Sequence, residues 1–276
     1  MMNFRYQSYV LLAAITLFAS SCYKKFDADS YKPALSIGGY TSASEIAPGN
    51  LVAYWGFNDN LTDSISKTNC DNSGTSFTTG IKGRALKGAD KAYALFTPGT
   101  AITGLKAFTI TLWVNNPQNT NGIVGLLSLS NTKSFWGNID IFFENGSTDT
   151  KAILKMHVAS AQGEAWLGNY ELQNVWDRWT NLALSYNGVD SFKVYVNGLK
   201  IATQVKSGAG PIQFLNPGKM VFGTSQFQTV PSLTSEATAQ DWASYLTGGL
   251  DEVRIYNKAL EEADVSALVK LEGRGK

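Results

Sequence analysis

The feature that most restricts the fold of this chain is a series of short segments in which apolar and polar residues alternate. In residues 108–114, Phe, Ile, Leu and Val occupy every second position, which places them on one face of a strand. Asn-Gly pairs at 145–146, 187–188 and 197–198 are strong signals for tight hairpin turns. Because no helical segments separate these strands, the sequence predicts antiparallel sheets.

Similar segments extend over most of the chain, and only its end shows helical spacing. Residues 260–271 place apolar side chains at helical spacing, with acidic residues early and Lys270 late. The predicted fold class is therefore all-β with one short C-terminal helix. We expect strands near residues 51–57, 108–114, 123–129, 139–143, 153–158, 179–186, 192–196, 199–205, 219–222 and 247–256.

The last predicted strand carries an acidic residue on the side that we expect to face the core. By strict alternation, Asp251 shares a face with Val253 and Ile255. A buried carboxylate needs a cation or several hydrogen-bond donors to offset its lost hydration. Alternatively, Asp251 lies just beyond the strand end and is half solvated.

The composition agrees with one β domain that does not bind nucleic acid. The 276 residues are 44% hydrophobic and 16% charged, and 26 of them are glycine, which suits many strands joined by tight turns. The leader supplies one of the 23 basic residues and none of the 22 acidic ones, so the remaining chain has 22 of each. Because no basic stripe is present, nucleic acid is excluded as an expected partner.

The first residues have the pattern of an export signal that ends at a cysteine. Arg5 precedes an apolar run at 10–18, and small residues lead to Cys22, which predicts a signal peptide over 1–21 rather than a membrane span. The run resembles the lipobox of bacterial lipoproteins, in which the cysteine becomes the acylated N-terminus. This resemblance implies a lipoprotein of the cell envelope, held in the outer membrane. The alternative is an ordinary secretory leader cut near Ser21.

Residues 22–48 are polar and lack a sustained period, so we expect a flexible tether followed by one domain over 49–276. The Lys-Lys-x-Asp-x-Asp sequence after Cys22 resembles the acidic surface-export signals of Bacteroidetes lipoproteins, although a solvated charged tether has the same pattern. If Cys22 is acylated, the second cysteine, Cys70, has no partner and no disulfide holds the domain together.

Three segments, in this order, resemble the concanavalin A-like and laminin-G-like family of bacterial surface proteins. They are residues 51–64 with 83–86, residues 108–114, and residues 179–188 with 194–198, 250–256 and 259–260. The resemblance covers nearly all of 51–271 and implies a two-sheet antiparallel jelly-roll sandwich. It does not specify a function, because the fold hosts lectins, glycosidases, lyases and adhesion domains.

In this family a structural calcium ion often ties the first strand to the last. Carried over to this chain, the resemblance implies Asn58 and Asp251 as ligands, with Asp63 or Asp59 as further candidates. Oxygen ligands of this kind suit Ca²⁺. The chain departs from the family at Asn58, where an aspartate is common, and the lost charge weakens a cation site. The alternative is that Asn58 and Asp251 accept hydrogen bonds from loop backbone.

The sequence contains no motif that predicts catalysis. A laminarinase-type Glu-x-Asp-x-x-Glu strand, which places two carboxylates on one face, does not occur, and Glu144 and Glu164 are isolated. The single histidine, His157, excludes a zinc site built from several histidines, and we expect it to be packed or surface-facing. We therefore expect a non-catalytic protein. The alternative is an enzyme, a glycosidase or a lyase, that uses carboxylates or a tyrosine contributed by separate strands.

Four aromatic residues lie in surroundings rich in Gly, Asn and Ser, where a flat apolar face can stack on a sugar ring. They are Trp136, Trp166, Tyr170 and Trp242. The alternative is that these side chains cap the open ends of the sandwich. The long stretch 225–244 is expected to be either a specificity loop or a disordered insertion.

Together these observations predict a membrane-anchored, non-catalytic domain of the bacterial cell envelope that binds a glycan or another surface protein. The first alternative is a glycoside hydrolase or polysaccharide lyase on the same fold. The second is a structural, protein-binding subunit of a surface assembly.

Overall fold

The structure is a computed structural model that describes residues 36–276, which form one compact unit. The predicted signal peptide over 1–21, the candidate lipidation site Cys22 and the tether up to residue 35 lie outside the described residues.

Residues 36–276 form sixteen strands, which include every segment predicted from the sequence and six others, among them β10, which carries Trp166 and Tyr170. One group of strands comprises β1 (Leu51–Trp55), β3 (Ser76–Thr79), β4 (Arg84–Lys87), β6 (Phe108–Asn115), β11 (Thr180–Tyr186), β12 (Ser191–Val196), β13 (Leu199–Val205) and β16 (Gly249–Tyr256). The other comprises β2 (Asp71–Ser73), β5 (Tyr93–Phe96), β7 (Ile123–Asn131), β8 (Ile139–Asn145), β9 (Lys151–Ser160), β10 (Gly163–Gln173), β14 (Pro217–Phe222) and β15 (Ala243–Ser244).

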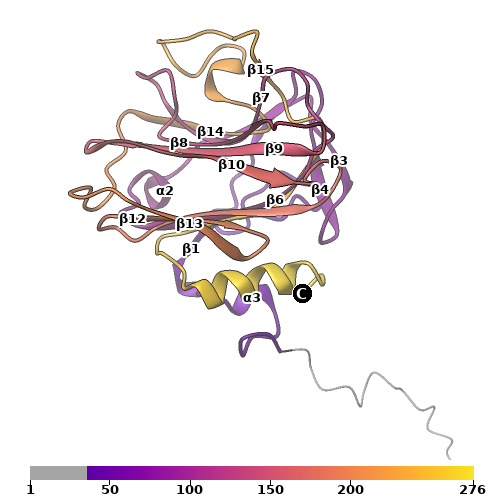
Figure 1. The fold of residues 1–276 in the computed structure, drawn as a ribbon, viewed down its shortest axis with the longest axis vertical. Coiled ribbons are helices and arrows are strands. Elements are labelled where there is room, and N and C mark those ends of the chain that lie inside the picture. Colours follow the sequence, from indigo (N-terminus) through magenta and orange to yellow (C-terminus); the bar gives the residue numbers. More distant parts are fainter. Residues whose placement is uncertain (1–35) are drawn as a thin grey trace, which may run out of the picture. The chain divides into compact units, whose positions relative to one another are not determined.

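The two groups form two sheets that face each other (Figure 1). Sheet 1 has the order β13-β12-β11-β6-β16-β4-β3, with β1 paired to β16. Sheet 2 has the order β10-β9-β8-β7-β14-β5-β2, with β15 paired to β7. Neighbouring strands are antiparallel, except that β15 runs parallel to β7. The predicted all-β sandwich is confirmed.

Within the described residues the helices are short, and the longest is the predicted one at the C-terminus, α3 (Glu262–Glu272). The others in this part of the chain are α2 (Thr100–Thr103) and the 3₁₀ helices Ala43–Glu45, Pro48–Asn50 and Gln226–Gln228. Within residues 36–276, no helix has the length and apolar character that a membrane span requires.

The main core fills the space between the sheets. Trp55 on β1 is fully buried in it, and its ring centroid lies 4.8 Å from that of Phe96 and 4.9 Å from that of Phe222 in edge-to-face contacts. Phe108, Ile110, Leu112 and Val114 all belong to this core, as the alternation of β6 predicts. The predicted Asn-Gly turns join β11 to β12 and β12 to β13, and Asn197 adopts the left-handed conformation (φ 50°) that such a turn needs.

The first and last strands lie side by side, but a bulge changes which residues of β16 face the core. Glu252 has a positive φ of 47°, and the pairing of β16 with β6 shifts between Asp251 and Arg254. Leu250, not Asp251, therefore joins Val253 and Ile255 in the core. The predicted core-facing orientation of Asp251 is wrong, because alternation holds only across an unbroken ladder.

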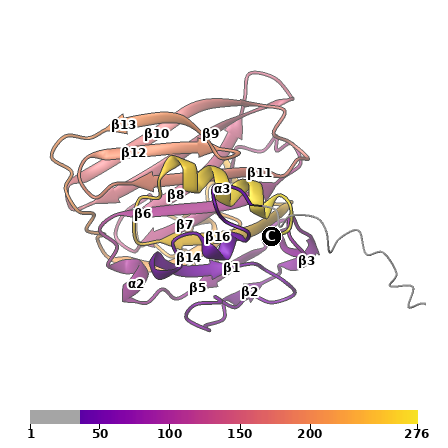
Figure 2. The same cartoon turned by 90° about the horizontal axis from the view of Figure 1, so that it is seen from below.

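A second cluster of apolar side chains lies where α3 covers the outer face of sheet 1 (Figure 2). Leu268 and Leu271 of α3 pack there with Tyr195 and Tyr256 of the sheet. Ile46 also belongs to this cluster, although the sequence places it in the predicted tether. The compact unit begins at Ser36, so the predicted boundary at residue 49 lies inside it.

Removing one methylene group from Ile46 tests whether this segment is part of the cooperative domain. Ile46 is 1% exposed, so Ile46→Val should lower the free energy of unfolding by about 0.5–1.5 kcal/mol. Ile65→Val is the matched control, because Ile65 is 46% exposed and its change should stay within about 0.5 kcal/mol. Urea denaturation measures both, and equal midpoints for the two variants would show that residues 36–48 add nothing to the domain.

Candidate functional site

Three tryptophans predicted from the sequence come together on the outer face of sheet 2. We call Trp136, Trp166 and Trp242 the tryptophan patch. The ring centroid of Trp136 lies 5.1 Å from that of Trp166 and 6.2 Å from that of Trp242. Trp166 is 42% exposed and Trp242 is 43% exposed, so two large aromatic side chains remain accessible next to Trp136.

Each tryptophan of the patch is held by contacts beneath it. The Trp136 ring stacks on Phe142 of β8, with centroids 5.4 Å apart and an angle of 9° between the planes. Trp166 on β10 lies opposite His157 on β9, and their ring centroids are 4.3 Å apart. The buried ring of Phe227 packs against both Trp136 and Trp242, and its centroid lies 5.5 Å from the centroid of each. The patch is therefore held in place before any ligand binds.

The stretch 225–244, which carries Trp242, is an ordered part of the fold. The buried side chain of Gln226 accepts a hydrogen bond from the backbone N–H of Asn131 at 2.7 Å and donates to the carbonyls of Ser134 and Phe135. The Gln228 side chain donates to the carbonyl of Ala243 at 2.8 Å. These bonds fix the stretch over sheet 2, so of the two alternatives drawn from the sequence a disordered insertion does not hold.

A row of polar side chains crosses sheet 2 under the patch. We call Ser128, Asp140, His157 and Glu164, on β7, β8, β9 and β10, the polar row. Asp140 accepts a hydrogen bond from Ser128 Oγ at 2.6 Å and lies 3.1 Å from His157 Nδ1. On its other side, His157 Nε2 lies 3.6 Å from a Glu164 carboxylate oxygen. His157, expected from the sequence to be packed or surface-facing, is thus buried between two carboxylates.

The polar row does not have the geometry of a hydrolase site. Asp140 lies between Ser128 and His157, so the histidine cannot remove a proton from the serine. Asp140 is also buried, whereas a glycosidase needs both carboxyl groups beside the sugar. Only Glu164 reaches the surface, where the indole nitrogen of Trp166 donates to it at 3.4 Å. The row supports the patch from below and offers one exposed carboxylate beside it.

The fourth predicted residue, Tyr170, lies away from the patch. The pairing of β10 with β9 shifts between Leu167 and Tyr170, and Tyr170 then lies opposite Leu154, a core residue. The Tyr170 side chain accordingly packs against the core between the sheets. Without this shift, Trp166 and Tyr170 would share a face, as the sequence suggested.

Two of the candidate calcium ligands meet at the turn between β3 and β4. Asp251 Oδ2 accepts hydrogen bonds from the backbone N–H groups of Ile81 at 2.9 Å and Lys82 at 3.2 Å. Asn58 Oδ1 accepts one from Arg84 at 2.8 Å. The alternative drawn from the sequence, hydrogen bonding to loop backbone, therefore describes both side chains. The backbone of this turn can approach the Asp251 and Asn58 oxygens only because it contains glycines, since a Cβ at Gly80 or Gly83 would clash with these oxygens.

The other two candidates have partners elsewhere. The buried carboxylate of Asp63 accepts hydrogen bonds from the N–H groups of Tyr54, Ile65 and Ser66, and Asp59 forms an exposed ion pair with Arg84 at 3.0 Å. Within residues 36–276, no group of three or more His, Cys, Asp or Glu side chains is arranged to hold a metal ion. A cation at the turn would rely on Asp251, the Asn58 amide and carbonyl groups.

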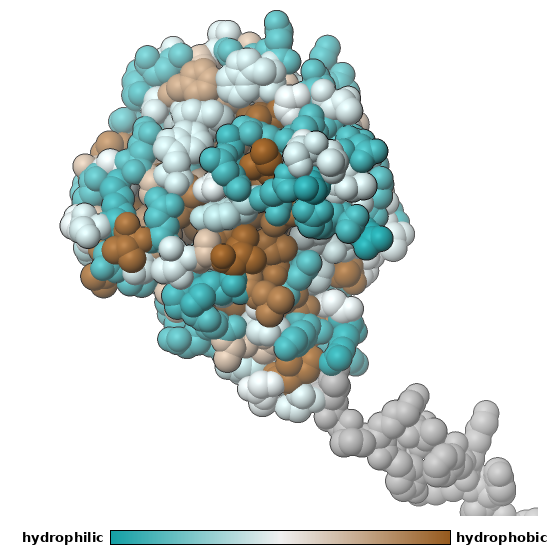
Figure 3. All heavy atoms as spheres, viewed as in Figure 1, coloured by the Kyte–Doolittle hydropathy of each residue, from teal (hydrophilic) through white to brown (hydrophobic). Residues whose placement is uncertain are grey.

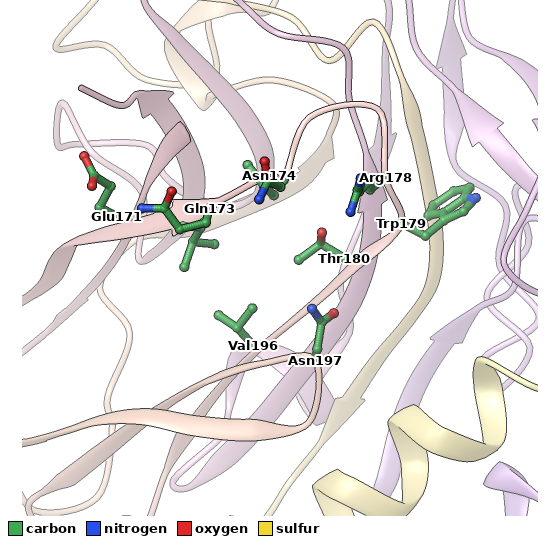
Figure 4. A pocket seen from close by; sticks show the side chains of 10 residues that line it. Glu171, Gln173, Asn174, Arg178, Trp179, Thr180, Val196 and Asn197 are labelled. Carbon is green, nitrogen blue, oxygen red and sulfur yellow. The ribbon is translucent and has the colours of Figure 1, made fainter. Parts of the chain in front are cut away.

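A polar groove beside β10 was not predicted. It has a volume of about 510 Å³ and lies between the end of β10 with the following loop and the turn from β12 to β13 (Figure 4). Gln173, Asn174, Arg178 and Asn197 line it. The only sequence signals were the Asn-Gly turn at 197–198 and the polar residues between two predicted strands.

Comparison with known proteins agrees with the sandwich fold. A family model for the concanavalin A-like lectin/glucanases superfamily matches residues 87–266. A search of curated proteins found no match. Among solved structures, one similar structure is domain 4 of AbnA in complex with arabinotriose; AbnA is a GH43 extracellular arabinanase from Geobacillus stearothermophilus. This domain is 19% identical, with a TM-score of 0.52 over 80% of this chain and 98% of that one.

Two toxin structures are also similar. The binding domain of Paraclostridial Mosquitocidal Protein 1 is 16% identical, with a TM-score of 0.58 over 80% of this chain and 52% of that one. A structure of botulinum neurotoxin type C is 14% identical, with a TM-score of 0.58 over 84% of this chain and 53% of that one. It is described in terms of this toxin's cell entry, which depends upon interaction with two ganglioside molecules. This chain therefore spans about half of each toxin chain. At these identities the likeness shows the fold.

Proposed function

This chain belongs to the concanavalin A-like lectin/glucanases superfamily, and we propose that it is a glycan-binding domain whose ligand stacks on the tryptophan patch. The observation that carries the proposal is the pair of exposed indole rings, Trp166 and Trp242, bridged by Trp136. Indole rings present a large, rigid apolar face at small entropic cost, and Glu164 beside Trp166 offers an acceptor for sugar hydroxyls.

Two of the similar structures support a sugar as the ligand. The arabinanase domain was solved with arabinotriose, and the botulinum neurotoxin is described as interacting with gangliosides. We propose that this domain binds glycan without cleaving it, because the polar row has one buried and one exposed carboxylate. The full proposal places the domain at the outer membrane through a lipid on Cys22, a residue outside the described part of the chain.

A glycan array that includes arabinotriose tests binding, and release of reducing sugar from each bound glycan tests cleavage. We expect binding to at least one neutral oligosaccharide and no release of reducing sugar. Binding to none would contradict the proposal, and turnover on any bound glycan would favour the glycosidase alternative. Labelling with a palmitate analogue, compared between the wild type and Cys22→Ala, tests the anchor separately.

We further propose that Ca²⁺ binds at the turn between β3 and β4, held by Asp251 and Asn58. Burial, followed by the charge of neighbouring Glu252, raises the pKa of Asp251 from 3.8 to about 8. The folded protein therefore keeps a proton that the unfolded chain releases between these two pH values. The folded state therefore has its full share of stability from this proton below pH 3.8, and it loses that share as the pH rises towards about 8. A calcium ion in place of the proton would remove this loss.

In the presence of a chelator, the melting temperature should fall as the pH rises from about 5 to about 8. Burial also raises the pKa of Glu272, which acts in the same direction. Added Ca²⁺ should raise the melting temperature, most strongly at the upper end of this range, where Asp251 loses its proton. Asp251→Asn should abolish the calcium response, and Asp59→Asn should keep it. A melting temperature that does not change with calcium at pH 8 contradicts this site.

A second candidate function is a protein-binding subunit, and an observation on β13 favours it. Leu199, Ile201 and Val205 are exposed on this edge strand. Apolar side chains also gather over sheet 1, the lower sheet in this view, on the face of the molecule that Figure 3 shows. Exposed apolar side chains on an edge strand occur at protein interfaces. Co-purification of a defined protein that Leu199→Lys prevents, together with binding to no glycan, would favour this function over the first.

A further inference from the structure

The polar groove is lined by side chains whose hydrogen-bonding groups have no partner among the described residues. These groups are the Gln173 and Asn174 amides, the Arg178 guanidinium and the Asn197 amide nitrogen, which lie along the groove in Figure 4. Asn197 Oδ1 is already engaged, because it accepts a hydrogen bond from the Asn181 N–H at 2.9 Å. Its NH₂ group therefore remains free to donate to a ligand.

The backbone that carries these groups is fixed. Val175 and Trp176 are buried in the main core, and the Trp176 indole donates to the carbonyl of Lys151 at 3.0 Å. Asn174 and Asp177, on either side of this pair, have positive φ angles of 51° and 55°. Their backbone N–H groups donate to Thr150 and Asn116, each at 2.8 Å. The turn therefore buries its apolar pair and holds Asn174 and Arg178 at the surface.

The one unpaired charge that lines the groove is positive. Glu171, at one end, forms an ion pair with Lys151 at 2.7 Å. Arg178 forms no ion pair within residues 36–276, although Asp149 and Asp177 line a neighbouring cavity of about 260 Å³ that Arg178 also borders. The free groups of the groove are mainly donors, and a planar guanidinium among them suits a carboxylate.

We propose that the polar groove is a second saccharide site, and that it binds a sugar with a carboxylate group through Arg178 and Asn197. Its volume of about 510 Å³ lies in the ordinary range for small-ligand sites, about 300–1,000 Å³. Leu172, Val196 and Trp179 add apolar surface against which a sugar ring can pack. At the tryptophan patch Glu164 presents an exposed carboxylate beside Trp166, which disfavours an anionic sugar against that ring. The two sites therefore select different sugars.

Calorimetric titration of the full chain tests this proposal with two sources of a sugar carboxylate. The probes are trigalacturonate, with its methyl ester as the uncharged control, and 3′-sialyllactose, with lactose as the control. We expect the wild type to bind at least one of the two acids, and to bind it better than its uncharged control. Arg178→Gln should weaken that binding about tenfold or more, because it removes a charged hydrogen-bond donor.

Further variants separate this site from the patch. Asn197→Asp keeps the acceptor for the Asn181 N–H but loses the NH₂ donor and adds a negative charge, so it should also weaken binding of the acid. Arg274→Gln, an exposed arginine of the C-terminus, and Trp166→Ala should leave it unchanged. The proposal is overturned if neither acid binds at millimolar concentration, or if Arg178→Gln binds as the wild type does. A loss with Trp166→Ala alone would assign the acid to the patch and overturn it equally.

Discussion

Replacing Arg254 with methionine should destabilise the domain by about 3–5 kcal/mol, because it leaves two buried carboxylates without their shared cation. Arg254 Nε donates to Glu272 at 2.7 Å, and its NH₂ group donates to Glu252 at 2.7 Å. These three side chains, the buried triad, are at most 2% exposed. Tyr54 donates to Glu252 at 2.6 Å, and the Trp113 indole donates to Glu272 at 2.7 Å. The triad joins α3 to the bulged strand β16.

Urea denaturation measures this loss, and two comparisons identify its cause. Arg84→Met removes an arginine that is 44% exposed and paired with Asp59, so it should cost less than about 1 kcal/mol. Adding Glu252→Gln and Glu272→Gln to Arg254→Met should recover part of the stability, because no unpaired charge remains buried. If Arg254→Met costs no more than Arg84→Met, the triad does not hold α3 on the sheet.

Replacing both exposed tryptophans with alanine should abolish glycan binding. If each indole is a central contact worth about 2 kcal/mol, each substitution lowers affinity about thirtyfold, and the pair lowers it about a thousandfold. Isothermal titration with a glycan selected on the array measures Trp166→Ala, Trp242→Ala and the double variant. The reason is geometric, because both rings are accessible and Trp136 holds them within one surface.

Tyr170→Phe is the control for the double tryptophan variant. Tyr170 was predicted from the sequence as a fourth contact, but its side chain packs on the core side of β10. Its substitution should therefore leave affinity unchanged. Near wild-type affinity in the double variant would remove the patch as the binding site, even if the domain still binds sugar.

Local sequence patterns were enough to predict the sandwich, but not which way every side chain points. Alternation in residues 108–114 and the Asn-Gly turns determine strands and hairpins, because they depend only on neighbouring residues. Bulges depend on tertiary pairing, and one at Glu252 and another between Leu167 and Tyr170 reversed the expected faces of Asp251 and Tyr170.

The candidate site was predictable as a set of residues, but not as an arrangement. Trp136, Trp166 and Trp242 were chosen from polar surroundings, and they meet because strand β10 and two loops far apart in sequence lie on one sheet face. The polar row depends on how four strands are aligned with one another. Alternation within a single strand does not predict that alignment. Ile46 docks on α3 without any periodic signal around it.

The indole N–H resonances of the seven tryptophans, followed by NMR as a neutral glycan from the array is added, test the binding surface most directly. We predict that Trp166 and Trp242 shift in proportion to saturation, while Trp55 in the core and Trp179 at the polar groove stay unchanged. Saturable binding that leaves the Trp166 and Trp242 resonances in place would contradict the proposal that the tryptophan patch binds the glycan.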